Sequence, residues 1–195
     1  GGRLASKRIN GLRADIGAQF FTVRDPRFEE TIAFASDTGA VRRWSPRMGA
    51  FRNGRLVYSP DKQQRYVGFP YMNSLGNFLS QSVDVRREAR ISSVKRDGGM
   101  FVLTSTAGEI YTAEQVLVTA PVDQMRELLA DFETDQIASK FAMEPTWTTV
   151  VSSDDQLATV DGEIIDACFG GDHEVFDFIS VERSKPGRDS NLIVI

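Results

Sequence analysis

Two glycines followed by an arginine open the sequence, and this is the first pattern whose residue types could bind a ligand. Gly1 and Gly2 would let the backbone approach a ligand closely, and the guanidinium of Arg3 would offer a forked donor to phosphate. An ordinary loop explains the same tripeptide, and the sequence contains no complete Gly-x-Gly-x-x-Gly turn. The tripeptide therefore suggests the hypothesis of an anion-binding site without establishing it.

The single histidine and the single cysteine are the other residues that could carry chemistry. His173 stands in a polar turn with no second His or Cys close by, which favours a surface histidine over a metal ligand. Cys168 lies in an apolar stretch without a recognisable base, which favours a buried packing thiol over a nucleophile. The sequence therefore assigns no catalytic residue and no metal ligand.

Composition narrows the class of protein. Of the 195 residues, 41% are hydrophobic and 26% are charged, which is ordinary for a globular chain. The one Cys cannot form an internal disulfide and suits a reducing compartment, so we expect a cytoplasmic location. We expect neither a leader peptide nor a membrane span, because no apolar run is long enough.

Charge is divided unevenly along the chain. Residues 1–100 contain 18 Lys and Arg against 9 Asp and Glu, whereas residues 101–195 contain 5 against 18. The N-terminal half is therefore suited to meet an anion. Nucleic acid is disfavoured as that anion, because the aromatic residues fall on apolar faces instead of interleaving with a basic stripe.

Short strands and a few helices are the elements expected to position these residues. Asp25-Pro26 predicts a helix start, and apolar spacing extends that helix to about Gly39. Asn53-Gly54 predicts a tight hairpin, and period-two alternation over residues 85–112 predicts a three-stranded meander.

The second half of the chain is expected to continue in the same way. Gln115–Ala120 is typical of an apolar strand buried on both faces of a parallel sheet. Helices are expected from Pro121 and over about Thr134–Met143. Four more strands are predicted within residues 147–152, 163–169, 175–181 and 192–195. We therefore predict an α+β fold dominated by antiparallel strands.

Six blocks of sequence share their order with one known family. They are residues 1–8, 14–28, 65–72, 116–121, 145–147 and 184–188. The most specific are Gly-Ala-Gln-Phe-Phe-Thr-Val-Arg-Asp at 17–25 and Ser-Lys-Pro-Gly-Arg at 184–188. In these blocks the chain resembles the renalase-like flavin-dependent oxidoreductases, which belong to the larger flavin-containing amine oxidase group.

The resemblance implies an FAD enzyme with a Rossmann-type dinucleotide-binding domain and a substrate domain built on a large antiparallel sheet. It implies a partial FAD-domain segment at 1–40 that runs into the substrate domain, and substrate domain at 41–80 and 131–195. Residues 81–130 would be a meander and strand of the FAD domain. The family's Gly-x-Gly-x-x-Gly turn and C-terminal flavin-binding segment are not in the sequence, so we expect an internal fragment.

The resemblance also implies which residues meet the cofactor. Arg3 would reach toward the phosphate and ribose with Gly2 permitting the approach, and the 17–19 segment would run beside the flavin ring. The backbone of Ile91 would pair with the adenine end, and Ala120-Pro121 would close a strand that passes the dinucleotide. The family usually has Gly where Tyr71 stands, so a ring there is expected to reshape the pocket. The full set is Gly2, Arg3, Gly17, Ala18, Gln19, Ile91, Ala120 and Pro121.

The implied reaction is hydride transfer from a reduced, nitrogen-containing small molecule to the flavin, with dioxygen reoxidising the flavin. Isomeric dihydronicotinamide dinucleotides are one candidate substrate, because a basic mouth would suit their pyrophosphate. Two alternatives stay open: a catalytically silent substrate-binding or interaction domain, and a basic nucleic-acid-binding domain. We expect no nucleic-acid or membrane partner, and the sequence leaves the oligomeric state open.

We expect the 195-residue chain to purify colourless or with substoichiometric flavin, because its sequence lacks the glycine-rich turn and helix N-terminus that would neutralise a pyrophosphate. The visible flavin absorbance of the purified chain measures this directly. A preparation loaded with one flavin per chain would refute the expectation.

Overall fold

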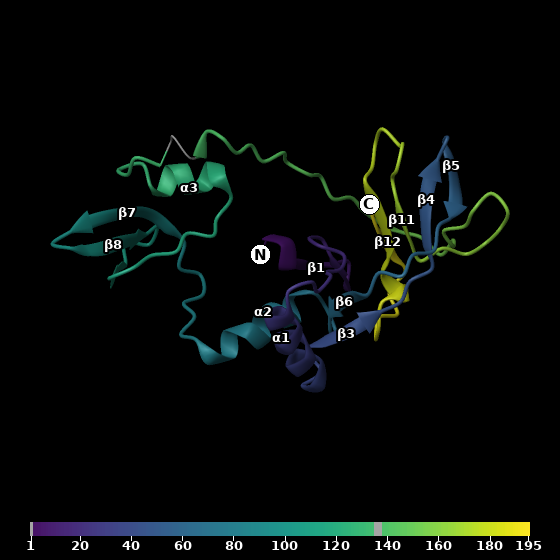
Figure 1. Ribbon diagram of the computed structural model, residues 1–195, viewed down its shortest axis with the longest axis horizontal. Helices are drawn as coiled ribbons and strands as arrows, with labels where there is room; N and C mark the ends of the chain where they lie inside the picture. The colour runs from purple at the N-terminus through teal and green to yellow at the C-terminus, as the bar shows by residue number, and fades with distance from the viewer. Residues whose placement is uncertain (1, 135–137) are drawn as a thin grey trace. The chain divides into compact units, whose positions relative to one another are not determined.

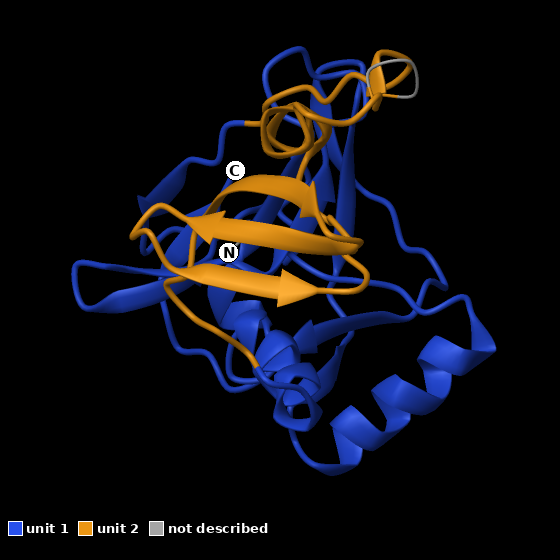
Figure 2. Ribbon diagram, turned by 90° about the vertical axis from the view of Figure 1, so that its left-hand side faces the viewer, with its two compact units in different colours: residues 1–84, 147–195 blue, residues 85–146 orange. Residues whose placement is uncertain are grey.

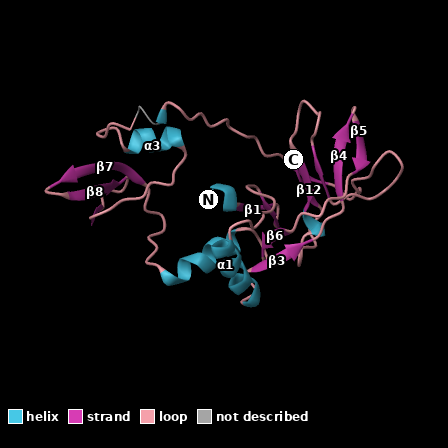
Figure 3. Cartoon of the chain, viewed as in Figure 1, coloured by secondary structure: helices cyan, strands magenta, loops and turns pink. Residues whose placement is uncertain are grey.

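The computed structural model describes residues 2–134 and 138–195, and it divides into two compact units. Unit 1 comprises Gly1–Asp84 and Trp147–Ile195, and unit 2 comprises Val85–Thr146 (Figure 2). Strands outnumber helices and most strand pairs are antiparallel (Figure 3), so the predicted α+β class is confirmed. No helix among the described residues is long and apolar enough to cross a membrane.

Unit 1 holds most of the elements (Figure 1). In chain order they are η1 (Gly2–Leu4), β1 (Ser6–Ile9), β2 (Leu12–Asp15), α1 (Pro26–Asp37), β3 (Val41–Trp44), β4 (Met48–Arg52), β5 (Arg55–Tyr58), β6 (Arg65–Gly68), α2 (Asn73–Leu79), η2 (Ser80–Ser82), β10 (Val150–Ser152), β11 (Ala167–Phe169), β12 (Phe178–Val181), η3 (Glu182–Ser184) and β13 (Leu192–Val194).

The N-terminal strands β1 and β2 form a hairpin that the sequence analysis did not predict. Asn10 and Gly11 make its turn with φ angles of 49° and 85°, the left-handed conformation that a two-residue hairpin turn of this type requires. The register then pairs Ser6 with Asp15 at the open end. This hairpin brings the two ends of the predicted cofactor segment, residues 2–19, close together.

Helix α1 forms as predicted. The side chain of Asp25 accepts a hydrogen bond from the backbone N–H of Arg27 at 2.9 Å, which caps the helix, and Pro26 occupies its first turn. Its buried residues Ile32 and Ala35 pack with Val41 of β3. The helix therefore covers the short antiparallel β3–β6 pair.

The main sheet of unit 1 has the strand order β10-β13-β12-β11-β4-β5. All its pairs are antiparallel except β11 with β4, where Cys168 lies opposite Gly49. The β4–β5 hairpin turns at Asn53-Gly54, as predicted. Each of the four strands expected after residue 147 is present over a shorter range. Two apolar clusters form the core beside this sheet, one around Trp44, Met48, Val67, Met72 and Ala167 and one around Leu56, Ile165, Cys168 and Ile179.

Unit 2 contains the predicted meander. Its strands pair antiparallel in the order β7-β8-β9, and residues of the later helix contact β7. The elements are β7 (Ile91–Asp97), β8 (Met100–Ser105), β9 (Ile110–Ala113) and α3 (Val122–Leu128).

The predicted buried strand at Gln115–Ala120 is wrong for this structure. These residues form no strand, and Leu117 is 88% exposed. A strand buried on both faces needs hydrogen-bonded neighbours and cover, and within residues 2–134 and 138–195 no segment pairs with this one. The helix predicted over about Thr134–Met143 lies partly outside the described residues, and 141–143 are not helical.

The side chain of Cys168 packs in the apolar core beside the main sheet of unit 1, as the apolar sequence around it predicts. The residue is fully buried, and burial raises the pKa of its thiol to about 11. A thiol in this environment is a packing group, because only the thiolate is a nucleophile.

We expect a disulfide reagent to modify Cys168 slowly in the folded chain at about pH 8 and rapidly in denaturant, since unfolding restores an ordinary thiol pKa. In the folded chain the rate should rise as the pH approaches 11. Colorimetric thiol titration measures both rates. Equal rates in folded and unfolded chain would contradict the packing role.

Candidate functional site

The two N-terminal segments that were assigned to the cofactor lie against each other in unit 1. The backbone N–H of Ala18 donates to the carbonyl oxygen of Arg3 at 2.7 Å, and those of Ile16 and Gly17 donate to Ala5 at 3.0 and 3.2 Å. Residues 2–5 and 16–18 therefore form one backbone unit next to the β1–β2 hairpin.

Gly17 has no room for a side chain at this contact. A Cβ atom there would lie 2.7 Å from the carbonyl oxygen of Gly2 and would also collide with the backbone of Arg3. Gly2 itself has open space where a Cβ would stand, and the Arg3 side chain is exposed. The pair of segments thus leaves Gly2 unobstructed and the Arg3 guanidinium exposed, and a guanidinium is a donor that suits phosphate.

The Gln19 side chain holds this segment from inside. Its Nε2 donates to the carbonyl oxygens of Asp15 at 2.7 Å and Gly17 at 3.0 Å, and its Oε1 accepts from Lys185 Nζ at 2.8 Å. Because both ends of the amide are engaged, Gln19 positions the 15–19 backbone through its side chain.

Four fully buried charged side chains stand behind this segment: Asp15, Glu182, Lys185 and Arg188, all with 0% exposure. Arg188 bridges the two acids, with one terminal nitrogen 2.7 Å from Asp15 Oδ2 and the other 2.6 Å from Glu182 Oε2. Lys185 pairs with Glu182 and lies 4.0 Å from Asp15 Oδ2. We call these four residues the buried charge cluster.

Neutral groups satisfy the remaining hydrogen-bonding atoms of the cluster. Asp15 Oδ1 accepts from Ser6 Oγ at 2.6 Å and from the backbone N–H of Met72 at 2.9 Å. Arg188 Nε donates to the carbonyl oxygen of Pro70 at 2.9 Å. Two acids, two bases and complete hydrogen bonding are the conditions under which buried charges are tolerated.

Burial lowers the pKa of Lys185 from its ordinary value, and the nearby Arg188 adds to that effect. The carboxylates of Glu182 and Asp15 act in the opposite direction, because they favour the charged ammonium. The Trp44 ring, whose centroid is 5.8 Å from the ammonium, closes the site on its apolar side. The pKa of this lysine is thus set by burial against two carboxylates.

The sequence analysis did not identify the buried charge cluster. Asp15 and Arg188 are 173 positions apart, so no local spacing connects them. The block Ser184–Arg188 was recognised as specific, and it supplies Lys185 and Arg188. That block pointed to Lys185 and Arg188, but the sequence does not show which acids pair with them.

Three predicted cofactor residues belong to unit 2. Ile91 begins β7 opposite Ser105, and Ala120 and Pro121 come directly before α3. Their role at the cofactor stays a prediction.

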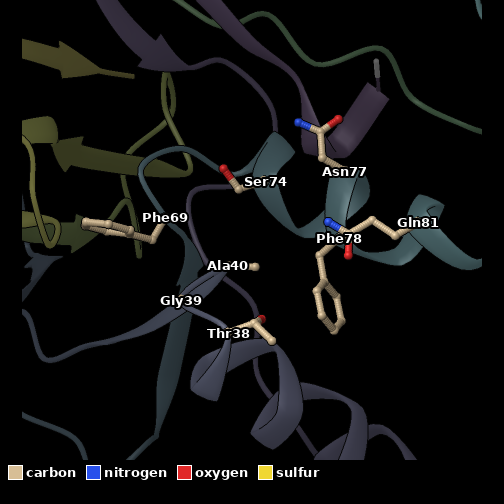
Figure 4. Close-up of a pocket in the computed structure, with 8 residues that line it drawn as sticks. All are labelled: Thr38, Gly39, Ala40, Phe69, Ser74, Asn77, Phe78 and Gln81. Carbon is tan, nitrogen blue, oxygen red and sulfur yellow. The ribbon is translucent and has the colours of Figure 1, made fainter.

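A cavity of about 240 Å³ lies in unit 1 between the end of α1 and helix α2 (Figure 4). It is lined by Thr38, Gly39, Ala40, Phe69, Ser74, Asn77, Phe78 and Gln81. This lining holds no acid or base, so the cavity offers no group for proton transfer.

His173 packs between aromatic rings. Its ring centroid lies 4.0 Å from that of Phe176 and 5.2 Å from that of Phe51, and its Nδ1 accepts from the backbone N–H of Val175. No group of three His, Cys, Asp or Glu residues in the described ranges could hold a metal ion.

Comparison with known families decides the class of this chain. The sequence model for flavin containing amine oxidoreductases matches residues 45–146, just over half of the chain. The chain belongs to this family. The match supports a flavin-dependent amine oxidoreductase kind of function with FAD as the cofactor. It includes Ile91, Ala120 and Pro121, whereas residues 2–19 and the buried charge cluster lie outside it.

We expect the variant Arg188→Met to lower the free energy of unfolding by about 3–5 kcal/mol, because it leaves Asp15 and Glu182 buried without a shared cation. The matched control is Arg27→Met, which removes an arginine from an ion pair whose Arg side chain is 91% exposed. Urea unfolding measures both. Equally small losses of stability in the two variants would contradict the structural role of the cluster.

Proposed function

We propose that the chain is part of a renalase-like oxidoreductase that uses FAD to oxidise a reduced, nitrogen-containing small molecule by hydride transfer, with dioxygen as the acceptor. The observation that carries this proposal is the backbone unit of residues 2–5 and 16–18, where Gly17 packs directly on Gly2 and Arg3. Membership of the amine oxidoreductase family supports the cofactor.

The residues of this chain supply binding and position in that reaction. The Arg3 guanidinium would pair with cofactor phosphate, and Gly2 would leave the backbone open to it. Gly17 would let the segment that carries Gln19 pack against Gly2 and Arg3. Gln19, held by Lys185, would keep the segment in place beside the ring. When bound, FAD supplies the hydride acceptor and the route of electrons to dioxygen.

The organisation of the chain is part of the same proposal. Residues 1–40 and 81–130 would belong to a Rossmann-type flavin domain, and 41–80 and 131–195 to the substrate domain. The exposed apolar segment 115–120 supports this, since a segment of that composition is suited to a buried parallel strand. The chain would then be an internal fragment of a longer cytoplasmic enzyme.

Isomeric dihydronicotinamide dinucleotides are the proposed substrates. The excess of cations in residues 1–100 supports a ligand that carries a pyrophosphate. Tyr71, where the family usually has Gly, stands next to the buried charge cluster with its ring centroid 4.9 Å from the Arg188 guanidinium. It would narrow the pocket relative to relatives with Gly.

The full-length protein tests the cofactor role of Arg3. The variant Arg3→Gln should raise the Kd for FAD about tenfold or more, because it removes a charge-assisted hydrogen bond to phosphate. Arg24→Gln makes the same change at an exposed arginine outside the backbone unit and should leave flavin content unchanged. Flavin loss on dialysis measures both, and equal retention by the two variants would overturn the proposed role.

The same protein tests the substrate. Hydrogen peroxide release should accompany turnover of isomeric reduced nicotinamide dinucleotides and be weak with simple amines. Release with amines alone would exclude the dinucleotide substrates and leave the family assignment intact.

A further inference from the structure

The β1–β2 hairpin carries positive charge that the described residues do not neutralise. Lys7, Arg8 and Arg13 precede the first acidic residue of the chain, Asp15, and that carboxylate is buried against Arg188. Within residues 2–134 and 138–195 no carboxylate forms an ion pair with any of the three hairpin cations. The hairpin is therefore a local source of positive potential.

Arg8 and Arg13 share one face of this hairpin. They are direct cross-strand partners, and the next pair on the same face, Ser6 with Asp15, leads to the buried charge cluster. Like charges placed directly opposite each other destabilise an antiparallel pair. A bound anion would remove that repulsion.

The guanidinium of Arg13 stacks on the Tyr71 ring. The guanidinium carbon of Arg13 lies 4.7 Å from the ring centroid, and that of Arg188 lies 4.9 Å from it. Tyr71 is half-buried, and its hydroxyl makes no hydrogen bond to any residue that the structure describes. The ring thus restricts Arg13 while its hydroxyl keeps a free donor.

A second hairpin of the chain places two arginines directly opposite each other without an aromatic ring. Arg52 and Arg55 are also direct partners, at the exposed turn of β4–β5. Arg52 donates to Ser59 Oγ at 3.2 Å, and no described aromatic ring stacks on either arginine. This pair has the same charge in direct opposition, next to its turn, and lacks a stacked ring, which makes it the control.

We propose that Arg8, Arg13 and Tyr71 form a binding site for a phosphate group. Two guanidinium groups offer forked donors that match phosphate oxygens, and the phenol adds another donor. The phosphate of a dinucleotide cofactor and that of a phosphate-bearing substrate present the same oxygens, so the site accepts either chemistry. The site does not depend on the proposed redox function.

Titration calorimetry of the 195-residue chain with inorganic pyrophosphate tests the site. The double variant Arg8→Gln/Arg13→Gln should raise the Kd about tenfold or more, because it removes both charge-assisted contacts. The control Arg52→Gln/Arg55→Gln removes the same net charge and should keep the Kd within about twofold. Equal losses in the two double variants, or no pyrophosphate binding to the unaltered chain, would overturn the proposal.

Thermal unfolding without added anion gives a second readout. Arg8→Gln, which keeps the contact between Arg13 and the Tyr71 ring, should unfold at the same temperature as the unaltered chain or above it, because the repulsion is gone. A lower unfolding temperature would show that the arginines stabilise the hairpin by themselves and would overturn the argument.

Competition identifies the source of the phosphate. Displacement of pyrophosphate by FAD assigns the site to the cofactor, and displacement by a reduced nicotinamide dinucleotide alone assigns it to the substrate. Pyrophosphate binding that needs both arginines, in a protein that shows no flavin reduction, would overturn the proposed function and support this site.

Discussion

The buried charge cluster is the constraint on which unit 1 depends. Asp15 ends β2, whereas Glu182, Lys185 and Arg188 follow β12, so one network of ion pairs ties the two ends of the unit together. In a low-dielectric interior none of the four charges is tolerable alone, and the removal of one leaves another uncompensated. The network also positions the predicted cofactor segment, because Lys185 Nζ donates a hydrogen bond to Gln19 Oε1.

The charges that each half of the chain contributes to the cluster are opposite in sign to the net charge of that half. The N-terminal half is rich in cations, yet its contribution to the cluster is an acid, Asp15, and the acidic half supplies both bases. Lys7 and Arg8 of the hairpin are exposed, whereas Lys185 and Arg188 supply the cations of the cluster. Arg65 is a buried cation from the N-terminal half, and it pairs with Asp61. Net charge along the chain therefore does not show which charged side chains are buried.

The family assignment and the site geometry rest on different parts of the chain. The match to flavin containing amine oxidoreductases spans residues 45–146, and the packed backbone unit of residues 2–5 and 16–18 lies before it. The two lines of support are thus independent. The thiol of Cys168 is a packing group, and no group of three metal-ligating side chains occurs among the described residues.

The sequence alone determined the local elements. Asp25-Pro26 specified the start of α1, Asn53-Gly54 a hairpin turn, and period-two alternation the meander of unit 2, because each of these signals acts within a few residues. It failed at Gln115–Ala120, where an apolar pattern needs partner strands to become a strand. Only the tertiary structure decided that Asp15 meets Arg188 and that Tyr71 stacks on Arg13, because side chains far apart in sequence are brought together by packing and not by spacing.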